Sequence, residues 1–384
     1  MPKSSQKQQV KPAKPYKDFP LYPHATRRWA KKIRGRVYYF GKWDDPMAAL
    51  EKYQRQSDDL HAGRVPRDTE GGLELRHLAN HFLSAKQRQV DAGELQLKTF
   101  GDYHATATRL IDAFGVRRLV DDLRSDNFGR LRASMAKVRG PVALGNEIQR
   151  VRTIFKYGYD AGLLDKPIRF GPEFKKPSAK NIRQARQAKG ERMFSPYEIH
   201  RLLATASVQM KAMILLAINA GFGNTDLSEL PRVAVDLNKG MINFPRPKTA
   251  IARRVPLWQE TITALCEAIK SRPKPKNPAD HDLVFITKYR NRWVKCNSSG
   301  VTVDSVCSEF TKLLQCEGLK RPGISFYALR HVHRTIADEV GDNATCDLIM
   351  GHENTKYMAT RYRERIDDSR LRAVTDHVHT WLFR

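Results

Sequence analysis

The spacing of apolar side chains changes along the chain and predicts where its elements lie. Between residues 73 and 164, apolar positions recur at intervals of three and four, which is typical of amphipathic helices. Four helices are expected there, the third capped by Ser125 and the fourth over residues 142–161. The positions expected to face their shared core are Leu75, Leu78, Ala79, Phe82, Tyr103, Leu110, Ile111, Phe114, Phe128, Leu131, Met135, Ile148, Val151, Phe155 and Tyr157. Four helices of this size predict one compact bundle.

Two β-rich runs precede this helical region. Residues 29–33 and 37–40 flank Arg34-Gly35, a pair that favours a hairpin turn. A helix is expected over residues 46–61. The residues expected on its apolar side are Ala48, Leu50, Tyr53 and Leu60. The pattern therefore predicts a small sheet packed on one helix.

The pattern changes again at Ser195, where Ser-Pro-Tyr-Glu combines an N-cap, a proline at the first helical position and a glutamate at the third. Helices and short strands then alternate. A buried helix is expected over residues 212–220, short strands over residues 233–237, 241–244 and 251–257, and later helices over residues 303–317, 327–340 and 344–350. A final helix is indicated by an apolar stripe of Leu371, Val374, Val378, Trp381 and Leu382. The region predicts a separate α+β domain.

Positive charge is concentrated in two segments. The chain has 68 Lys+Arg against 41 Asp+Glu, a formal net charge of +27. Residues 1–43 contribute +11 and residues 166–192 contribute +7, so these two segments hold most of the excess. Neither has the apolar face of a membrane anchor, and a polyanion such as nucleic acid is the better partner.

The candidates for DNA contact follow this charge. Four of them lie in the predicted hairpin, namely Lys31, Lys32, Arg34 and Arg36. A basic sheet packed on a helix is a plausible groove reader, and the alternative is a folded basic cap that makes no groove contact. Arg246 and Arg253, on either side of Lys248, are candidates as well. Three further candidates lie in the proline-interrupted segment, namely Lys175, Lys176 and Lys180. A semi-extended linker lying on DNA there would let the flanking domains close around a duplex.

Other compositional features narrow the class of protein. The first twenty residues contain no apolar run of the kind a secretory signal needs, and the longest apolar stretch is about half of what a bilayer requires. We therefore expect a soluble, cytoplasmic protein with no membrane partner. The five cysteines include no CxxC pair, which favours reduced structural thiols over disulfides or a zinc site.

Five short motifs in the C-terminal region resemble the catalytic domain of the tyrosine recombinase, or phage integrase, family. They are AGFGNTDL at residues 220–227, a Lys248-Thr249 turn ahead of RVPL, YALRH at residues 327–331, LIMGH at residues 348–352, and Arg361-Tyr362. Their order and spacing match the family, including ten residues from the histidine of LIMGH to the last tyrosine. No single motif is specific, but their conjunction is.

This resemblance implies a fold and a partner. The implied organisation is multidomain and mainly α with small β-sheets: a basic disordered tail over residues 1–20, an N-terminal β-hairpin arm-type DNA-binding domain over 21–65, a helical core-binding bundle over 70–165, a basic linker over 166–193 and an α+β catalytic domain over 194–384. It further implies double-stranded DNA as the substrate and four protomers on two paired sites, with a monomer off DNA. In the family the terminal helix often docks on a neighbouring subunit, whereas in this chain it can also be simple core.

The resemblance also implies site residues. Tyr362 would be the nucleophile that forms a 3′-phosphotyrosine, with Tyr357 as the alternative. Arg330 would be the second of the two family arginines, His352 a phosphate donor and Lys248 the general acid. The reaction needs no cofactor and no metal, because the covalent link retains the energy of the phosphodiester bond.

Two positions depart from the family pattern. Gly223 stands where the family has its first arginine, and Tyr327 stands where a histidine is usual. Loss of one cation from the transition state should cost about 3 to 4 kcal/mol. Tyr327 can still donate a hydrogen bond. The hairpin arginines could supply the missing cation, and they are Arg246, Arg253 and Arg254.

Three functions therefore remain to be compared. The first is a site-specific recombinase with an atypical site, and the second is a DNA-binding architectural or regulatory protein on the same scaffold that no longer cleaves. A metal-dependent nuclease is the third, and the sequence shows no clustered carboxylates with ligand spacing for it. His331 is interpreted as structural, and the role of His333 is left open.

Overall fold

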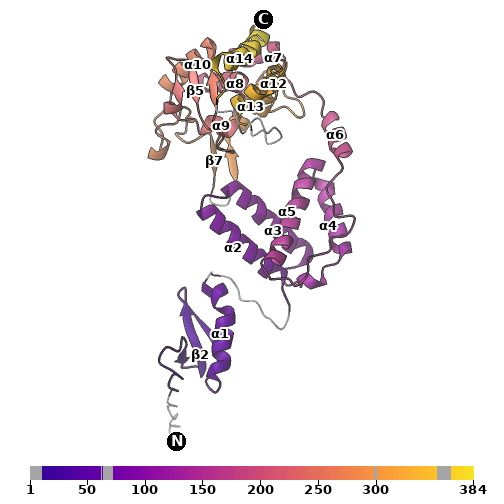
Figure 1. The fold of residues 1–384 in the computed structure, drawn as a ribbon, viewed down its shortest axis with the longest axis vertical. Coiled ribbons are helices and arrows are strands. Elements are labelled where there is room, and N and C mark those ends of the chain that lie inside the picture. Colours follow the sequence, from indigo (N-terminus) through magenta and orange to yellow (C-terminus); the bar gives the residue numbers. More distant parts are fainter. Residues whose placement is uncertain (1–10, 62, 64–71, 298–300, 353–364) are drawn as a thin grey trace, which may run out of the picture. The chain divides into compact units, whose positions relative to one another are not determined.

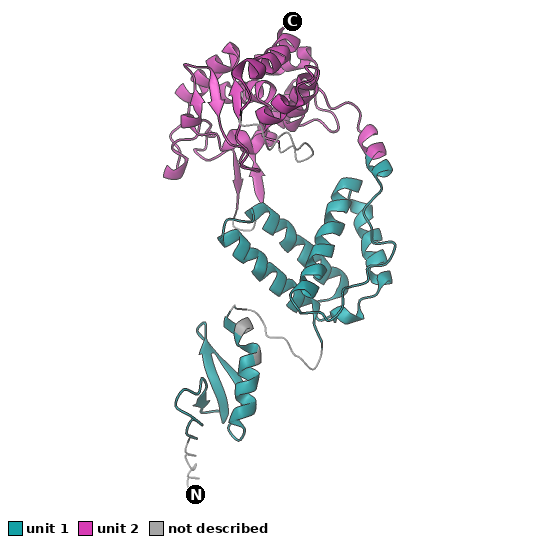
Figure 2. Ribbon diagram, in the orientation of Figure 1, with its two compact units in different colours: residues 1–182 teal, residues 183–384 magenta. Residues whose placement is uncertain are grey.

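The computed structural model describes residues 11–61, 63, 72–297, 301–352 and 365–384. Figure 1 shows its elements, and Figure 2 shows two compact units, Met1–Ile182 and Arg183–Arg384. The architecture is mainly helical with small sheets, as the sequence predicts. None of the described helices is long and apolar enough to cross a membrane.

The N-terminal unit begins with an antiparallel sheet of order β1-β2-β3 packed on one helix. Its elements are β1 (Tyr22–His24), β2 (Arg28–Ile33), β3 (Arg36–Lys42) and α1 (Pro46–His61). Arg34 and Gly35 both have positive φ, 49° and 83°, as a two-residue hairpin turn requires. The predicted hairpin and helix are confirmed, and β1 is an addition. Ala48 is wrongly placed on the buried side of α1: it is exposed, and Ala49 takes its place in the core.

Four longer helices follow and share a second core. They are α2 (Leu75–Asp91), α3 (Leu97–Phe114), α4 (Ser125–Val138) and α5 (Pro141–Asp160), with a short 3-10 turn η1 (Val120–Asp122) between α3 and α4. Most of the predicted core positions are buried, and Tyr103, Ile111, Phe114 and Tyr157 pack at its margin. Ser125 is not the cap of α4: the N-cap is Arg124, whose N–H donates to Asn127 Oδ1 at 2.9 Å, because the helix begins one residue earlier than predicted.

Residues 166–193 differ from a semi-extended segment in two ways. Phe174 is fully buried in the core of the bundle, and its carbonyl accepts a hydrogen bond from Arg152 Nη2 at 2.5 Å. Farther along, a helix α6 (Ala179–Gln187) forms with no buried residue. The prolines predicted an extended course, but aromatic packing and a polar helix shape this segment.

The C-terminal unit is built around α8 (Val208–Asn219), whose side chains are nearly all buried. The other helices of the unit are α7 (Pro196–Thr205), α9 (Asn224–Ser228), α10 (Gln259–Lys270), α11 (Ser305–Cys316), α12 (Tyr327–Asp338), α13 (Asn343–Met350) and α14 (Asp368–Phe383), with 3-10 turns η2 (Arg232–Ala234) and η3 (Pro278–Asp280). The predicted capping box is present at the start of α7, where Ser195 and Glu198 bond reciprocally. Helices α10 and α12 both pack against α8.

Two small antiparallel sheets complete this unit. One has the order β4-β5-β6, formed by β4 (Val235–Asp236), β5 (Met241–Asn243) and β6 (Arg254–Pro256), and the other pairs β7 (Val294–Cys296) with β8 (Thr302–Asp304). The strands of the first sheet are shorter than predicted. Val233, expected in a strand, lies in η2 and is 84% exposed, because the chain turns there before β4 begins.

The apolar stripe of α14 packs within its own unit. Leu371, Val374, Val378 and Leu382 are all at most 1% exposed and belong to the core around α8, and Trp381 packs against that core. In the described structure, α14 therefore packs against the core of its own C-terminal unit.

Candidate active site

Arg330 lies at the centre of a buried polar cluster in the C-terminal unit. It follows Tyr327 by one turn of α12, and only 2% of the residue is exposed. Its guanidinium donates hydrogen bonds to the carbonyl of Gly221 and to Met350 O, the latter at 3.0 Å. Its Nη2 also lies 2.8 Å from His352 Nε2. The segments that follow α8 and α13, which carry the AGFGNTDL and LIMGH motifs, therefore meet at Arg330.

Two glycines allow this close approach. Gly221 and Gly351 both have left-handed backbones, with φ of 62° and 63°. A Cβ on Gly221 would lie 2.9 Å from His333 Cδ2, and one on Gly351 would lie 2.8 Å from Arg246 Cβ. Any larger residue at either position would push the segments apart, so both glycines hold the cluster together.

Asp226 supplies the carboxylate of the cluster. It lies in α9, is 6% exposed, and its Oδ2 accepts a hydrogen bond from Gly223 N–H at 2.7 Å. Arg253 Nη2 lies 3.3 Å from Oδ1 of this carboxylate, and Arg330 Nη1 lies 3.8 Å from Oδ2. One carboxylate thus stands between two buried guanidinium groups. Asp226 belongs to the AGFGNTDL motif, but the sequence alone assigns it no role.

His352 follows the last turn of α13. Its N–H donates to Asp347 O at 2.8 Å, which fixes the backbone beside the left-handed Gly351. Burial and the neighbouring positive charge of Arg330 together lower the pKa of His352 to about 4. The imidazole is therefore neutral near pH 7, and because a guanidinium can only donate, Nε2 accepts from Arg330 while Nδ1 carries the proton.

The hairpin between β5 and β6 docks beside this histidine. Arg246 Nη1 and Thr249 Oγ1 lie 3.4 and 3.2 Å from Gly351 O, so the side chains on either side of the turn contact the residue before His352. Lys248 lies between them and is exposed. Arg254 points elsewhere, because its Nε and Nη2 donate to Asp368 in α14, each at 2.6 Å.

The remaining histidines and Tyr327 flank the cluster. Tyr327 is 45% exposed, and its ring would be 3.6 Å from a Cβ on Gly223. His331 is exposed, with its ring centroid 5.3 Å from that of Tyr327. His333 is fully buried, and its Nδ1 lies 2.7 Å from Ile218 O. His333 is therefore a buried residue that packs against Gly221 and bonds to the end of α8.

The two candidate nucleophiles, Tyr362 and Tyr357, lie outside the described residues, as does Arg361. The other predicted DNA contacts are distributed over both units. Lys32, Arg34, Arg36, Lys175, Lys176 and Lys180 are exposed, whereas Lys31 is half-buried and donates to Pro20 O at 2.9 Å. Arg246 is half-buried and Arg253 is 2% exposed, so these two belong to the interior cluster and not to the basic surface.

Positive charge exceeds negative charge in the cluster. Burial lowers the pKa values of Arg253 and Arg330; the charges of Arg330 and Arg246 lower that of Arg253 further, and the charge of Arg246 lowers that of Arg330. Asp226 is the carboxylate that offsets both Arg253 and Arg330. Buried cations in excess of their counter-ions are costly, and a bound anion would balance them. The cluster is therefore suited to a phosphate group.

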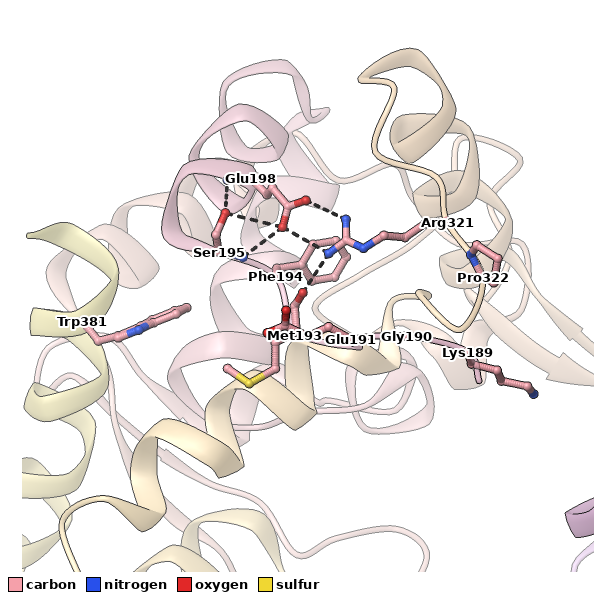
Figure 3. A pocket seen from close by; sticks show the side chains of 10 residues that line it. All are labelled: Lys189, Gly190, Glu191, Met193, Phe194, Ser195, Glu198, Arg321, Pro322 and Trp381. Atoms are coloured by element: carbon pink, nitrogen blue, oxygen red, sulfur yellow. Dashed lines mark hydrogen bonds and ion pairs between the residues drawn. The ribbon is translucent and has the colours of Figure 1, made fainter. Parts of the chain in front are cut away.

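A separate cavity of about 710 Å³ lies at the start of the C-terminal unit. Figure 3 shows its lining, which includes the Glu198–Arg321 ion pair at 2.6 Å and the ring of Trp381. None of the residues of the Arg330 cluster lines it. Among the described residues, no group of three or more His, Cys, Asp or Glu side chains is arranged to hold a metal ion.

The buried imidazole predicts a pH-dependent stability. Burial lowers the pKa of His333 from 6.5 to about 4, so the native chain binds this proton more weakly than the unfolded chain. Stability is then complete above about pH 6.5 and declines as the pH falls toward 4, by roughly 3 kcal/mol for this one group. Urea unfolding at pH 7.5 and pH 4.5 measures the decline. The same slope in His333→Asn would contradict the assignment, because Asn cannot titrate there.

Comparisons with known proteins identify a family for the C-terminal region and solved structures of similar fold. Residues 192–368 match the model of the phage integrase family. Among solved structures, a lambda integrase dimer bound to a COC′ core site is similar with a TM-score of 0.54 and 13% identity, covering 91% of this chain and 96% of that one. A lambda integrase tetramer bound to a Holliday junction has a TM-score of 0.54 and 13% identity, covering 91% and 98%.

A transposon integrase shares the fold as well. The Tn1549 integrase in complex with transposon right end DNA has a TM-score of 0.56 and 15% identity, covering 80% of this chain and all of that one. No curated protein sequence matches at a significant level. The family match spans the motifs that carry Arg330, His352 and the final tyrosine, so residues 192–368 of this chain match the phage integrase family of tyrosine recombinases.

Proposed function

We propose that this protein is a site-specific DNA recombinase or integrase that cleaves and rejoins DNA through a 3′-phosphotyrosine at Tyr362. The observation that carries the proposal is the pair of buried guanidinium groups, Arg330 and Arg253, on either side of the Asp226 carboxylate, with the half-buried His352 beside Arg330, in a chain whose C-terminal region matches the integrase family. An excess of fixed cations is what a phosphate passing through a pentavalent transition state requires.

The chemistry needs no external reagent. The Tyr362 hydroxyl gives up its proton as its oxygen attacks the scissile phosphorus, the bond to the 5′ oxygen breaks, and the leaving oxygen takes up a proton to become a 5′-hydroxyl. The tyrosyl phosphodiester retains the bond energy, so a 5′-hydroxyl from a partner strand can attack it and release the tyrosine. Net bond types are unchanged, and neither ATP nor a metal enters the balance.

The described residues of the site have different roles in strand cleavage. Arg330 neutralises charge on the phosphate with a planar fork of donors, and the protonated Nδ1 or a reoriented Nε2 of His352 donates to a phosphate oxygen. Lys248, in the turn docked beside Gly351, supplies the proton to the leaving oxygen. Tyr327 stands at the usual histidine position and donates through its hydroxyl.

The rest of the chain binds and positions DNA. The basic sheet with Lys32, Arg34 and Arg36, and the exposed lysines near α6, contact phosphates, since phosphate contacts fix register and account for most salt-dependent affinity. Recombination exchanges strands between two duplexes, so four protomers would assemble on paired double-stranded sites. We propose an arm-type domain over residues 21–65, a core-binding bundle over 70–165 and a catalytic domain over 194–384.

A second function has one observation in its favour. Gly223 stands where the family carries an arginine, and a site short of one cation could have lost cleavage while keeping its affinity for DNA. The protein would then act as an architectural or regulatory factor on the same scaffold.

Covalency separates the two functions. A pool of duplexes with randomised core sequences, each nicked so that the short cleaved strand diffuses away, is incubated with the protein in EDTA and resolved on a denaturing gel. We expect a protein–DNA adduct that resists denaturation, together with a free 5′-hydroxyl end. DNA retained on a native gel without any adduct would favour the architectural function instead.

A further inference from the structure

Arg253 is the buried guanidinium with the fewest partners. No part of its side chain is exposed, and its Nε donates to Phe244 O at 2.9 Å. Among the described residues, neither Nη1 nor Nη2 has a hydrogen-bond acceptor in good geometry; the Asp226 carboxylate lies 3.3 Å from Nη2 as an ion pair only. Buried donors without acceptors are costly, so this arrangement points to an acceptor that binds there.

The surroundings hold this guanidinium in one place. Its carbon lies 4.2 Å from the ring centroid of Phe222 and 5.3 Å from that of Phe244. Cation–π contacts of this kind fix the plane of the group without occupying its N–H donors. Its stem packs on Gly351, where an added Cβ would meet Arg253 Cδ at 2.9 Å. These contacts therefore hold the Arg253 side chain in position next to Gly351, the residue before His352.

Arg253 and Arg330 are also linked through one carboxylate. Asp226 Oδ1 faces Arg253 and Oδ2 faces Arg330, so the two guanidinium groups lie on either side of it. Burial and the charge of Arg330 lower the pKa of Arg253 to about 10, which still leaves it protonated near neutral pH. The two other hairpin arginines are engaged differently, since Arg254 is paired with Asp368 and Arg246 contacts Gly351 O.

We propose that Arg253, the residue immediately before β6, contacts the scissile phosphate and replaces the arginine that Gly223 does not provide. This inference rests on the proposed function of the site. The two arginines would then form a pair of cations on one phosphate, as the reaction requires, with the first contributed from a different element than in the family pattern.

The position of Gly223 offers a direct complementation. Its φ and ψ are −98° and 176°, an extended conformation that any residue adopts, and an added Cβ would make only ordinary contacts, 3.4 Å to Asp226 Oδ2 and 3.6 Å to Tyr327. An arginine side chain can therefore start from this position. Gly223→Arg in the Arg253→Met background should recover cleavage if a guanidinium is what the variant lacks.

The test measures the rate of adduct formation on a nicked duplex taken from the pool. We expect Arg253→Met to lower the rate about 100-fold or more while DNA binding stays within about threefold. Met keeps the aliphatic stem, and unfolding curves verify the fold. Arg254→Met, the neighbouring residue outside the cluster, is the matched control and should keep the wild-type rate. An unchanged rate in Arg253→Met, or a loss confined to Arg246→Met, would overturn the inference and leave the proposed function intact.

A substrate with an uncharged scissile phosphate distinguishes direct contact between Arg253 and the phosphate from a purely structural role of Arg253. A duplex whose scissile phosphate carries a methyl group in place of one non-bridging oxygen has no charge left for Arg253 to offset. Arg253→Met should cleave it at close to the wild-type rate. A variant that stays slow on this duplex and is not rescued by Gly223→Arg would make Arg253 structural only, against the inference.

If the wild-type protein forms no adduct at all, the proposed function fails and anion binding decides the inference alone. Inorganic phosphate should then raise the melting temperature of the wild-type and Arg254→Met proteins above that in chloride of equal ionic strength. Loss of this shift in Arg253→Met would support a phosphate contact, and an equal shift in all three would overturn it.

Discussion

Replacing Tyr362 with Phe is expected to abolish the covalent adduct completely while leaving DNA binding unchanged. The substitution removes only the hydroxyl oxygen of Tyr362. Tyr362 is the tyrosine that lies ten residues after His352, the spacing that matches the family. Because the phenolic oxygen is the attacking atom, the loss of adduct formation should exceed any loss that follows from removing a stabilising cation. Adduct on denaturing gels and affinity on native gels measure the two properties side by side.

Tyr357→Phe is the matched control, since it lies five residues earlier in the same segment. It should form adduct at the wild-type rate. Adduct that persists in Tyr362→Phe but disappears in Tyr357→Phe would identify the other tyrosine as the nucleophile.

Replacing Arg330 is expected to have the next largest effect. Arg330→Lys keeps the positive charge but loses the fork that reaches Gly221 O, Met350 O and His352 together. The rate of adduct formation should fall by about 10² to 10³, or roughly 3 to 4 kcal/mol of transition-state stabilisation. Single-turnover rates at saturating protein measure the loss.

Stability must be followed in the same variant, because the lost hydrogen bonds also hold the cluster. Breaking a buried network of this kind costs a few kcal/mol, so unfolding curves are needed to verify that the variant is folded at the assay temperature. Arg201→Lys on α7, where the arginine pairs with Glu317 outside the cluster, is the control and should cleave normally. A normal rate of adduct formation in Arg330→Lys would contradict the claim that the bidentate guanidinium of Arg330 stabilises the transition state.

Local signals in the sequence predicted local structure well. The Arg34-Gly35 turn was predictable because a two-residue hairpin turn needs positive φ, and the capping box at Ser195 because its two hydrogen bonds are made within one turn. Errors of one residue arose where two neighbours satisfy the same pattern. Ala48 and Ala49 are chemically identical, and only packing against the sheet decides which is buried.

The weaker elements were missed for a related reason. Helix α10 contains in its first turns the β-branched run Thr261, Ile262 and Thr263, which has weak helix propensity, and the helix packs against α8. Phe174 is another example, because three prolines around it indicated an extended segment while its ring fills the bundle core. Tertiary contacts decided both cases.

The candidate site was predictable only in part. The motif order indicated that Arg330 and His352 would meet, and their 2.8 Å separation agrees with it. The sequence named three arginines as possible replacements for the missing one but could not choose among them. Arg253 lies immediately before β6 and Arg254 is its first residue; the neighbouring side chains take different partners, Asp226 for Arg253 and Asp368 for Arg254.

The identity of the residue joined to DNA tests the central claim most directly. The adduct from the wild-type chain is digested with protease, and the peptide that carries the nucleotide is sequenced by mass spectrometry. The account predicts a phosphodiester between the Tyr362 oxygen and a 3′ end of DNA. Linkage to a 5′ end, or to a serine, a lysine or any tyrosine other than Tyr362, would contradict it.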